Sequence, residues 1–283
     1  MTAPRAGVLR SALGTSWGLR SGVVLIAISV LVAIFAPLIA PHSPVEPNAL
    51  HVIENPSRTY LLGTDQLGRD VLTRVLYGGR FALVISLCAT VMIVVLGTFL
   101  GCLAAYRRGW FDQVLARLID TLLAIPAILG LLVVVTVLGA GMPIIVLVST
   151  VIYLPASTRV LRASAQTVVD LDYVTAARAR GERFWPILRR ELWPNILDVV
   201  MVELAVRASS ILLLVSALSF LGFGANPPTP DWGLMVSENR ALLAVAPWAT
   251  IAPIIALAFI ILGLNLAADG FAKARGVDRG VAR

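Results

Sequence analysis

The sequence predicts an all-α membrane protein that crosses the bilayer several times, and three observations support this prediction. First, 58% of the 283 residues are hydrophobic and 14% are charged, whereas soluble domains carry roughly 25% charged residues. Second, the apolar residues form runs of about the length that a transmembrane helix needs. Third, the Lys and Arg residues lie mainly between these runs, as the positive-inside rule describes. The net charge of +7 therefore indicates membrane topology, and we expect no nucleic-acid partner.

Six apolar runs are candidates for transmembrane helices. The first covers residues 22–39 and is longer than the apolar core of a signal peptide, which has about 7–15 residues. We therefore expect this run to be an uncleaved transmembrane helix. The other five runs cover residues 81–105, 118–138, 142–157, 195–221 and 247–268.

Three residues predict where some of these helices bend or begin. Pro126 lies inside the third run and Pro155 lies near the end of the fourth. Because proline removes a helical hydrogen bond, we expect the fourth helix to be interrupted at Pro155. Asn195 opens the fifth run, and asparagine is a frequent helix N-cap. We therefore expect the fifth helix to begin there.

Residues 41–80 form a long, proline-rich polar connection between the first and second helices. From Thr64 onward the pattern becomes helical, and an amphipathic helix of this kind is expected to lie at the membrane surface. His42 and His51 lie in the connection without the spacing of metal ligands, so we expect both to be solvated. The apolar face of the amphipathic helix consists of Leu67, Val71, Leu72, Val75 and Leu76, and its polar face of Arg69, Asp70, Thr73 and Arg74.

The distribution of positive charge predicts the orientation in the membrane. Six transmembrane helices place both termini on the same side. This topology puts seventeen Lys and Arg residues on that side and five on the other. Positive residues are in excess in cytoplasmic loops, so we expect both termini to be cytoplasmic.

We divide the chain at residues 80 and 272. Residues 1–80 hold an N-terminal tail, the first transmembrane helix and the extracytoplasmic segment with its amphipathic helix. Residues 81–272 hold the other five transmembrane helices and a polar, basic segment at about 170–195. Residues 273–283 form a cytoplasmic tail.

The segment at 170–195 is the most basic run in the chain and is predicted to form two short helices. Asp172 is expected to cap the first helix with its side chain. Pro186 suits the first turn of the second helix, and Pro194 is expected to end it. The segment is either an amphipathic linker between membrane helices or a surface that binds another protein.

One predicted face of this segment has a small centre. Val174, Ala177, Gly181 and Phe184 follow helical spacing, so they share one face of a helix. The small side chains at Ala177 and Gly181 would let another protein approach closely.

ATP hydrolysis by this chain is excluded by its residues. A phosphate-binding loop needs a Gly-Lys pair followed by Ser or Thr, and the single lysine, Lys273, stands between Ala272 and Ala274. We find no catalytic, cofactor-binding or metal-binding pattern. Energy for any transport must come from another subunit or from an ion gradient.

Glu203 and Arg207 form a candidate ion pair inside the fifth helix, in the favourable order one turn apart. Charges within a membrane are costly and are candidates for function. Two interpretations are open: the pair fixes the helix in place, or it takes part in gating.

Two phrases in the chain resemble a known family. Residues 62–72 and 77–80 are similar to the segment before the second helix in dipeptide and oligopeptide permeases. Thr175-Ala176-Ala177, then Gly181 and Pro194, resemble the cytoplasmic coupling loop of ATP-binding cassette (ABC) importer permeases. This loop usually reads Glu-Ala-Ala, three residues, Gly and a later Leu-Pro, often with a His before the Pro, so the chain departs from it at Thr175 and at Glu191. With residues 219–233, the resemblance extends over residues 20–272 and is to the second, C-type permease subunit of the dipeptide/oligopeptide (nickel) family.

The resemblance implies the type I ABC importer permease fold, with a coupling helix at about 170–195. It implies a bacterial plasma membrane protein, surrounded by membrane lipid, that works by alternating access. The implied partners are a homologous permease, two ATPase domains that carry ATP and Mg, and an extracytoplasmic solute-binding protein. The residues implied to couple to the ATPase are Tyr173, Thr175, Ala176, Ala177, Gly181, Glu182 and Pro194.

The implied substrates are di- and oligopeptides, with haem, nickel or glutathione as alternatives. A rival interpretation is an ion-coupled secondary transporter, which needs no ATPase and carries charges at the membrane midplane. A membrane scaffold is a third. The segment at 170–195 argues against both.

Overall fold

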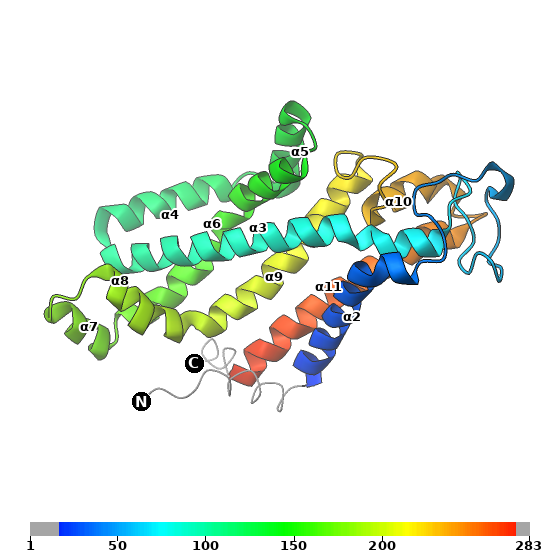
Figure 1. The fold of residues 1–283 in the computed structure, drawn as a ribbon. Coiled ribbons are helices and arrows are strands. Elements are labelled where there is room, and N and C mark those ends of the chain that lie inside the picture. Colours follow the sequence, from blue (N-terminus) through cyan, green and yellow to red (C-terminus); the bar gives the residue numbers. More distant parts are fainter. Residues whose placement is uncertain (1–16, 276–283) are drawn as a thin grey trace.

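The computed structural model describes residues 17–275, and the regular elements in this range are helices (Figure 1). Five helical stretches in this range are long and apolar enough to cross a membrane. The prediction of an all-α, multi-pass membrane protein is confirmed. Arg5, Arg10, Arg279 and Arg283, which contribute to the predicted charge asymmetry, lie outside the described residues. The long helices are α2 (Trp17–Ile39), α3 (Val71–Arg107), α6 (Met142–Val169), α9 (Trp193–Phe220) and α11 (Pro247–Arg275).

The third predicted span is broken rather than straight. It consists of α4 (Gly109–Leu123) and α5 (Ala127–Leu138), which are bent by 80° at the residues between them. Pro126 is the N-cap of α5, because its missing N–H and fixed φ suit the start of a helix better than its interior. In Figure 1, α5 projects away from the other helices. Counted with this bent pair, the spans number up to six.

The shorter elements lie at the two ends of the molecule (Figure 1). One end, which we call the α7 end, holds α7 (Asp172–Ala179), α8 (Phe184–Ile187) and a π-helical turn, η2 (Leu188–Leu192). The opposite end, which we call the α10 end, holds residues 40–70 and α10. Its elements are η1 (Ala49–His51), α10 (Trp232–Asn239) and η3 (Arg240–Leu242).

Helices α2 and α11 run antiparallel in close contact. A Cβ atom at Gly22 would lie 2.4 Å from the Ala267 nitrogen, and one at Gly270 would lie 2.2 Å from the Leu19 nitrogen. Small residues at a contact let two membrane helices approach closely. The first described residues of the chain therefore pack beside the last ones, as a count of six spans predicts.

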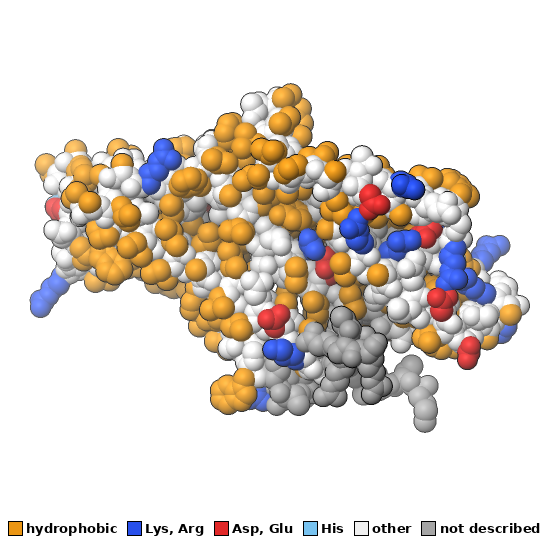
Figure 2. Space-filling view, turned by 180° about the vertical axis from the view of Figure 1, so that it is seen from behind, with side chains coloured by type: hydrophobic (Ala, Val, Ile, Leu, Met, Phe, Trp, Pro, Cys, Tyr) orange, Lys and Arg blue, Asp and Glu red, His pale blue; other side chains and the backbone are white. Residues whose placement is uncertain are grey.

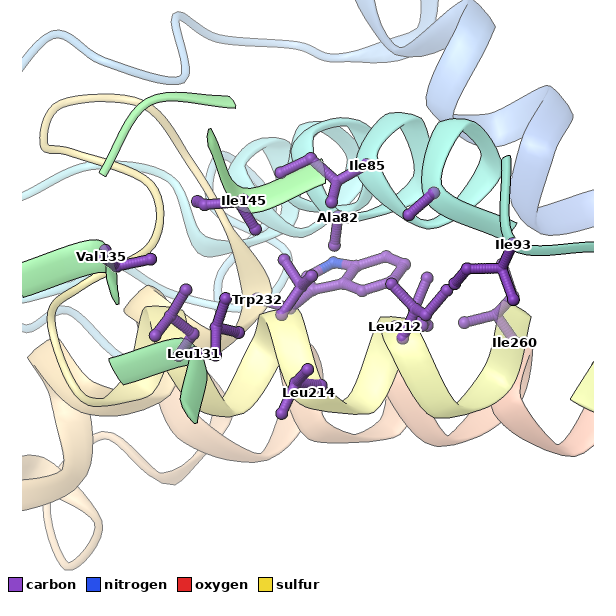
Figure 3. Packing of buried hydrophobic residues seen from close by; sticks show 14 of the residues in the cluster. Ala82, Ile85, Ile93, Leu131, Val135, Ile145, Leu212, Leu214, Trp232 and Ile260 are labelled. Carbon is purple, nitrogen blue, oxygen red and sulfur yellow. The ribbon is translucent and has the colours of Figure 1, made fainter. Parts of the chain in front are cut away.

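The main core lies between α3, α6 and α9. Figure 3 shows the Trp232 ring between α3, which carries Ala82 and Ile85, and α9, which carries Leu212 and Leu214. These side chains are nearly or fully buried. The core thus joins the membrane helices to α10, because Trp232 is the first residue of that helix.

The expected surface helix before the second span is not present as a separate element. Helix α3 begins at Val71 and continues without a break to Arg107, so residue 80 lies inside it. Its expected polar face is buried: the exposed fractions are 2% for Arg69 and Asp70 and 0% for Arg74. These side chains are buried because they find polar partners within the protein, as the next section describes.

The fourth span passes through Pro155 without an interruption. Helix α6 continues to Val169, twelve residues beyond the predicted end at residue 157. Close packing against α3 supports it, since a Cβ atom at Gly101 would lie 2.7 Å from the Arg162 nitrogen. Neighbouring helices allow proline inside a membrane helix in this way.

Candidate functional site

Residues 170–195, which we call the coupling segment, begin with a short helix whose cap differs from the expected one. Leu171 is the N-cap of α7, and Asp172 is its first residue without a side-chain capping bond. The predicted cap at Asp172 is therefore wrong. Its carboxylate still lies in the first turn, where the helix dipole favours negative charge.

Gly181 ends α7 in a conformation that requires glycine. Its φ is +79°, in the left-handed region that favours glycine. The Gly181 N–H donates to the Arg178 carbonyl at 2.9 Å, and the Glu182 N–H donates to the Ala177 carbonyl at 3.1 Å. These two bonds form a Schellman motif. Gly181 is also exposed, and a Cβ atom there would have no neighbour within 4 Å.

The residues of the predicted face with a small centre do not share one surface: some are buried in the protein and others are exposed. Val174 and Ala177 are fully buried within the chain and pack with residues of α3, α6 and α9. Ala177 therefore holds α7 in place and does not reach an outer surface. The exposed residues of α7 include Tyr173, Thr175 and Ala176.

Aromatic and cationic contacts fix the coupling segment to the end of α3. The Arg178 guanidinium donates to the Tyr106 carbonyl at 2.9 Å and lies 4.2 Å from the centre of the Tyr106 ring. Trp185 stacks on Phe99 at 5.7 Å between ring centroids. We did not predict these contacts, because they join residues about 70 or more positions apart.

The second half of the segment continues into the membrane. Pro186 lies in the first turn of α8, as predicted. Pro194, however, does not end a helix; it lies in the first turn of α9, directly after the π-helical turn. The expected cap at Asn195 is also wrong, because its Nδ2 donates to the Glu191 carbonyl at 2.6 Å from within the helix. The wider π turn accommodates a residue without an N–H.

Two other predicted coupling residues make local contacts. Glu182 forms an ion pair with Arg180 at 2.7 Å, next to the exposed Gly181. Partial burial raises the pKa of the Tyr173 phenol, and the Glu191 carboxylate raises it further. Tyr173 is therefore uncharged at neutral pH and presents an exposed hydroxyl.

A second site lies at the α10 end, where three buried charges and one partly buried charge form what we call the charge cluster: Asp65, Arg69 and Arg74, which are buried, and Glu238, whose side chain is 14% exposed. Arg69 donates to Asp65 at 2.8 Å and to Glu238 at 2.9 Å. Arg74 contacts the same two carboxylates, with 3.0 Å to Glu238. Each carboxylate thus bridges both guanidiniums, and the cluster joins the loop before α3 to α10.

The charge cluster accounts for the phrase at residues 62–72. Asp65 Oδ1 also accepts from the backbone N–H groups of Leu67 and Arg69, so its carboxylate organises the loop. Gly63 and Gly68 have φ of +73°, and a Cβ atom at Gly68 would lie 1.9 Å from the Asn48 carbonyl oxygen. The loop is therefore compact and is built around one buried acid.

Contact with the Trp232 ring explains why residues 77–80 contain two adjacent glycines. Its indole N–H donates to the Val75 carbonyl at 2.9 Å. Cβ atoms at Gly78 and Gly79 would each lie 2.6 Å from the indole ring. The paired glycines thus make the shallow surface of α3 on which α10 rests. Before Trp232, Asp231 caps α10 by accepting from the Leu234 N–H at 3.1 Å, and burial raises the pKa of Asp231 to about 6.

The predicted ion pair in the fifth helix is present. Arg207 Nε lies 2.6 Å from Glu203 Oε1, and 6% of the Glu203 side chain and 14% of the Arg207 side chain are exposed. The Arg207 guanidinium also lies 5.8 Å from the centre of the Tyr153 ring on α6. Among residues 17–275, no group of three His, Cys, Asp or Glu residues could hold a metal ion.

Comparison with known proteins identifies the family. Residues 93–277 match the family described as the inner membrane component of binding-protein-dependent transport systems. The chain belongs to this family. It is therefore a multi-pass membrane component of a transport system, and family membership assigns it transport rather than a catalytic reaction. The match includes the coupling segment, whereas three members of the charge cluster precede it.

Similar proteins cover most of this transport component. It is 32% identical to a dipeptide transport system permease of Alkalihalophilus pseudofirmus over 89% of this chain and 83% of that protein. It is 34% identical to a dipeptide transport system permease of Haemophilus influenzae over 89% and 88%. It is 36% identical to a glutathione transport system permease of Pectobacterium atrosepticum over 78% and 73%. The resemblance to peptide ABC importer permeases is confirmed.

The surface of the transport component is divided by charge. Figure 2 shows hydrophobic side chains over much of one face and charged side chains gathered toward one end, which corresponds to the α7 end in Figure 1. The exposed cations in the coupling segment are Arg180, Arg183, Arg189 and Arg190. These residues make the α7 end a polar surface that lipid tails would not solvate.

Proposed function

We propose that this chain is one half of a heteromeric permease that imports short peptides, with energy from ATP hydrolysed on partner subunits. The observation that carries the proposal is the similarity, over about nine-tenths of the chain, to permeases named for dipeptide transport. The implied partners are a second, homologous permease, two ATPase domains with ATP and Mg, and an extracytoplasmic solute-binding protein.

The break between α4 and α5 supports a partner within the membrane. Residues 123–126 are all exposed in this chain, at an 80° bend. Irregular backbone is not stable against lipid tails, and it occurs at membrane depth only when protein or a water-filled cavity covers it. A second permease packed at the break would supply that cover.

The coupling segment supports docking of an ATPase. Its exposed small and polar positions, Thr175, Ala176 and Gly181, lie beside Tyr173 at the α7 end. In this proposal Ala177 supports α7 from beneath, Glu182 holds the turn after it, and Pro194 shapes the entry into α9. An ion-coupled transporter would have no use for such a surface.

Glutathione is the second candidate substrate, because one of the relatives is named as a glutathione transport permease. Glutathione is itself a short peptide, so both candidates have a free carboxylate and an amine. Haem and nickel, which the family resemblance also implies, have different chemistry and can be tested separately.

Reconstitution in liposomes tests the proposal. The chain, its partner permease, the ATPase subunits and the solute-binding protein are combined, and uptake of labelled di- to pentapeptides and glutathione is measured. We expect uptake that requires ATP and every component. Uptake of haem or nickel without peptides would overturn the substrate. Uptake by this chain alone on an ion gradient would overturn the architecture.

Cysteine labelling tests the proposed orientation, in which both termini and the coupling segment are cytoplasmic. The exposed residues Ser57, Arg180 and Thr229 are each replaced by cysteine in a background without Cys88 and Cys102. An impermeant reagent added to intact cells should label positions 57 and 229. Labelling of position 180 from outside would contradict the orientation.

A further inference from the structure

The ion pair between Glu203 and Arg207 lies deep in the membrane region. Arg207 is near the middle of α9, which extends from Trp193 to Phe220 and is about 40 Å long at 1.5 Å per residue. The hydrocarbon core of a bilayer is about 30 Å thick. The pair is therefore far from either membrane surface. It lies at the depth of the bilayer where a charge is most costly.

The pair does not join two helices. Glu203 and Arg207 are four residues apart on the same helix, so their bond adds nothing to the contact between α9 and its neighbours. A pair that only fixed α9 in place would be expected to bridge to another element. The Glu203–Arg207 bond alone therefore does not fix α9 against another helix; α9 meets α6 at this point through the contact of the Arg207 guanidinium with the Tyr153 ring.

The guanidinium retains unused binding capacity. Arginine has five N–H donors, and within the described residues Arg207 makes one hydrogen bond, from Nε to Glu203. Its position over the Tyr153 ring orients the guanidinium plane beside α6. Glu203 offsets the charge of Arg207, whose side chain is 14% exposed and whose Nη1 and Nη2 make no hydrogen bond within the described residues.

We propose that Arg207, oriented by Glu203 and Tyr153, binds the terminal carboxylate of the peptide as it crosses the membrane. The inference rests on the proposed function, since it names a contact for the same substrate. Guanidinium and carboxylate pair through two parallel hydrogen bonds, and this pairing is stronger in a site of low dielectric constant. Arg207 is thus a specificity-determining residue for peptides with a free carboxylate.

The test compares a dipeptide with the same dipeptide amidated at its C-terminus. Uptake is measured in the reconstituted complex, with each peptide at a concentration that saturates the solute-binding protein. All variants use the same binding protein, so a change in the acid-to-amide ratio reports on the permease. The variants are Arg207→Gln, Arg207→Lys and the uncharged pair Glu203→Gln with Arg207→Gln. Recovery of intact complex on purification shows that each variant assembles.

We expect Arg207→Gln to lower turnover of the free acid about 10- to 100-fold, as loss of a charge-assisted contact would, and to leave the amide nearly unchanged. Arg207→Lys should retain part of the preference. The double variant Glu203→Gln with Arg207→Gln should also lose the preference for the free acid. Because this variant leaves no unpaired charge in the membrane, its loss cannot come from a buried charge. Equal loss for both peptides, or no loss for either, would overturn the inference while peptide uptake by the unmodified complex upholds the proposed function. If the unmodified complex imports no peptide, both fail.

Discussion

The two ends of the molecule are held together in different ways. At the α10 end, the charge cluster and a tryptophan on paired glycines join segments that are more than 150 residues apart in the sequence. At the α7 end, the coupling segment rests on buried apolar residues such as Val174 and on one bonded arginine, Arg178. Its exposed residues include the small Ala176 and Gly181 together with Tyr173 and several arginines.

This difference indicates which end of the molecule is stabilised by contacts within the chain and which end has a surface for another protein. Buried charges are stable only when paired, and each charge of the charge cluster lies against an opposite charge of the same chain, although Nε and Nη2 of Arg74 make no hydrogen bond within the described residues. The coupling segment has exposed positions with open space around them, such as Gly181, where a Cβ atom would have no neighbour within 4 Å. The α10 end is thus self-sufficient, and the α7 end presents a surface for another protein. Four predictions follow the comparison from large effects on stability to small ones.

Replacing Asp65 with Ala should destabilise the chain by about 3–5 kcal/mol, because it leaves Arg69 and Arg74 buried with half of their partners. Thermal denaturation of the purified complex measures this. The matched control is Asp120→Ala, which removes an ion pair to Arg159 whose side chains are more than half exposed and should change stability by about 0–1 kcal/mol. Similar effects of the two variants would contradict the self-sufficient α10 end.

Raising the pH should lower the free energy of unfolding, because Asp231 at the α10 end then loses its proton. Its pKa in the folded protein is about 6, above the ordinary value of 3.8, so the folded state binds this proton more tightly than the unfolded state. The stability contribution is complete below about pH 4 and is lost as the pH rises through 6, by about 2–3 kcal/mol. Denaturation midpoints from pH 4 to 8 should show this slope. Asp231→Asn keeps the helix cap and should remove the slope; an unchanged slope would refute the assignment.

Replacing Gly79 with Ala should cost about 1–3 kcal/mol by overpacking. The new Cβ would lie 2.6 Å from the Trp232 ring, so α10 would have to move. Gly130→Ala is the control, because its nearest neighbour would be at an ordinary 3.4 Å. Equal stability of the two variants would show that α10 does not rest on α3 in the way described.

Replacing Ala176 with Trp should change the stability of the chain by less than about 0.5 kcal/mol, because the position is exposed. The same change should prevent the ATPase from binding, since a large side chain would separate the surfaces. Thermal denaturation and co-purification with the ATPase measure the two effects. Normal co-purification would remove Ala176 from the proposed contact.

Much of the fold could be predicted because hydrophobic runs and charge asymmetry depend on composition along the chain. The sequence did not show the 80° break after α4, because Pro126 is equally compatible with a kinked helix. Nor did the sequence indicate that the side chains of Arg69 and Arg74 are buried. Their helical spacing indicates a solvated face, and their burial depends on two carboxylates, those of Asp65 and of Glu238, the second of which is distant in sequence.

The coupling segment was predicted in position but less well in detail. The spacing of Val174 and Ala177 identified a common face correctly, yet it did not reveal that the face points into the chain. The glycine at position 181 has a sufficient explanation in its left-handed backbone, whereas the sequence suggested close approach. The contact of Arg178 with Tyr106 depends on the tertiary fold and has no local signal.

Hydrogen exchange provides the most direct test of the central claim, that the α10 end is complete and the coupling segment is completed by a partner. Amide exchange is measured in the purified permease pair with and without the ATPase subunits. We expect residues 172–183 to become protected when the ATPase binds, and residues 62–75 and 231–239 to be strongly protected in both states. Unchanged exchange in residues 172–183, together with new protection only at the α10 end, would contradict the account.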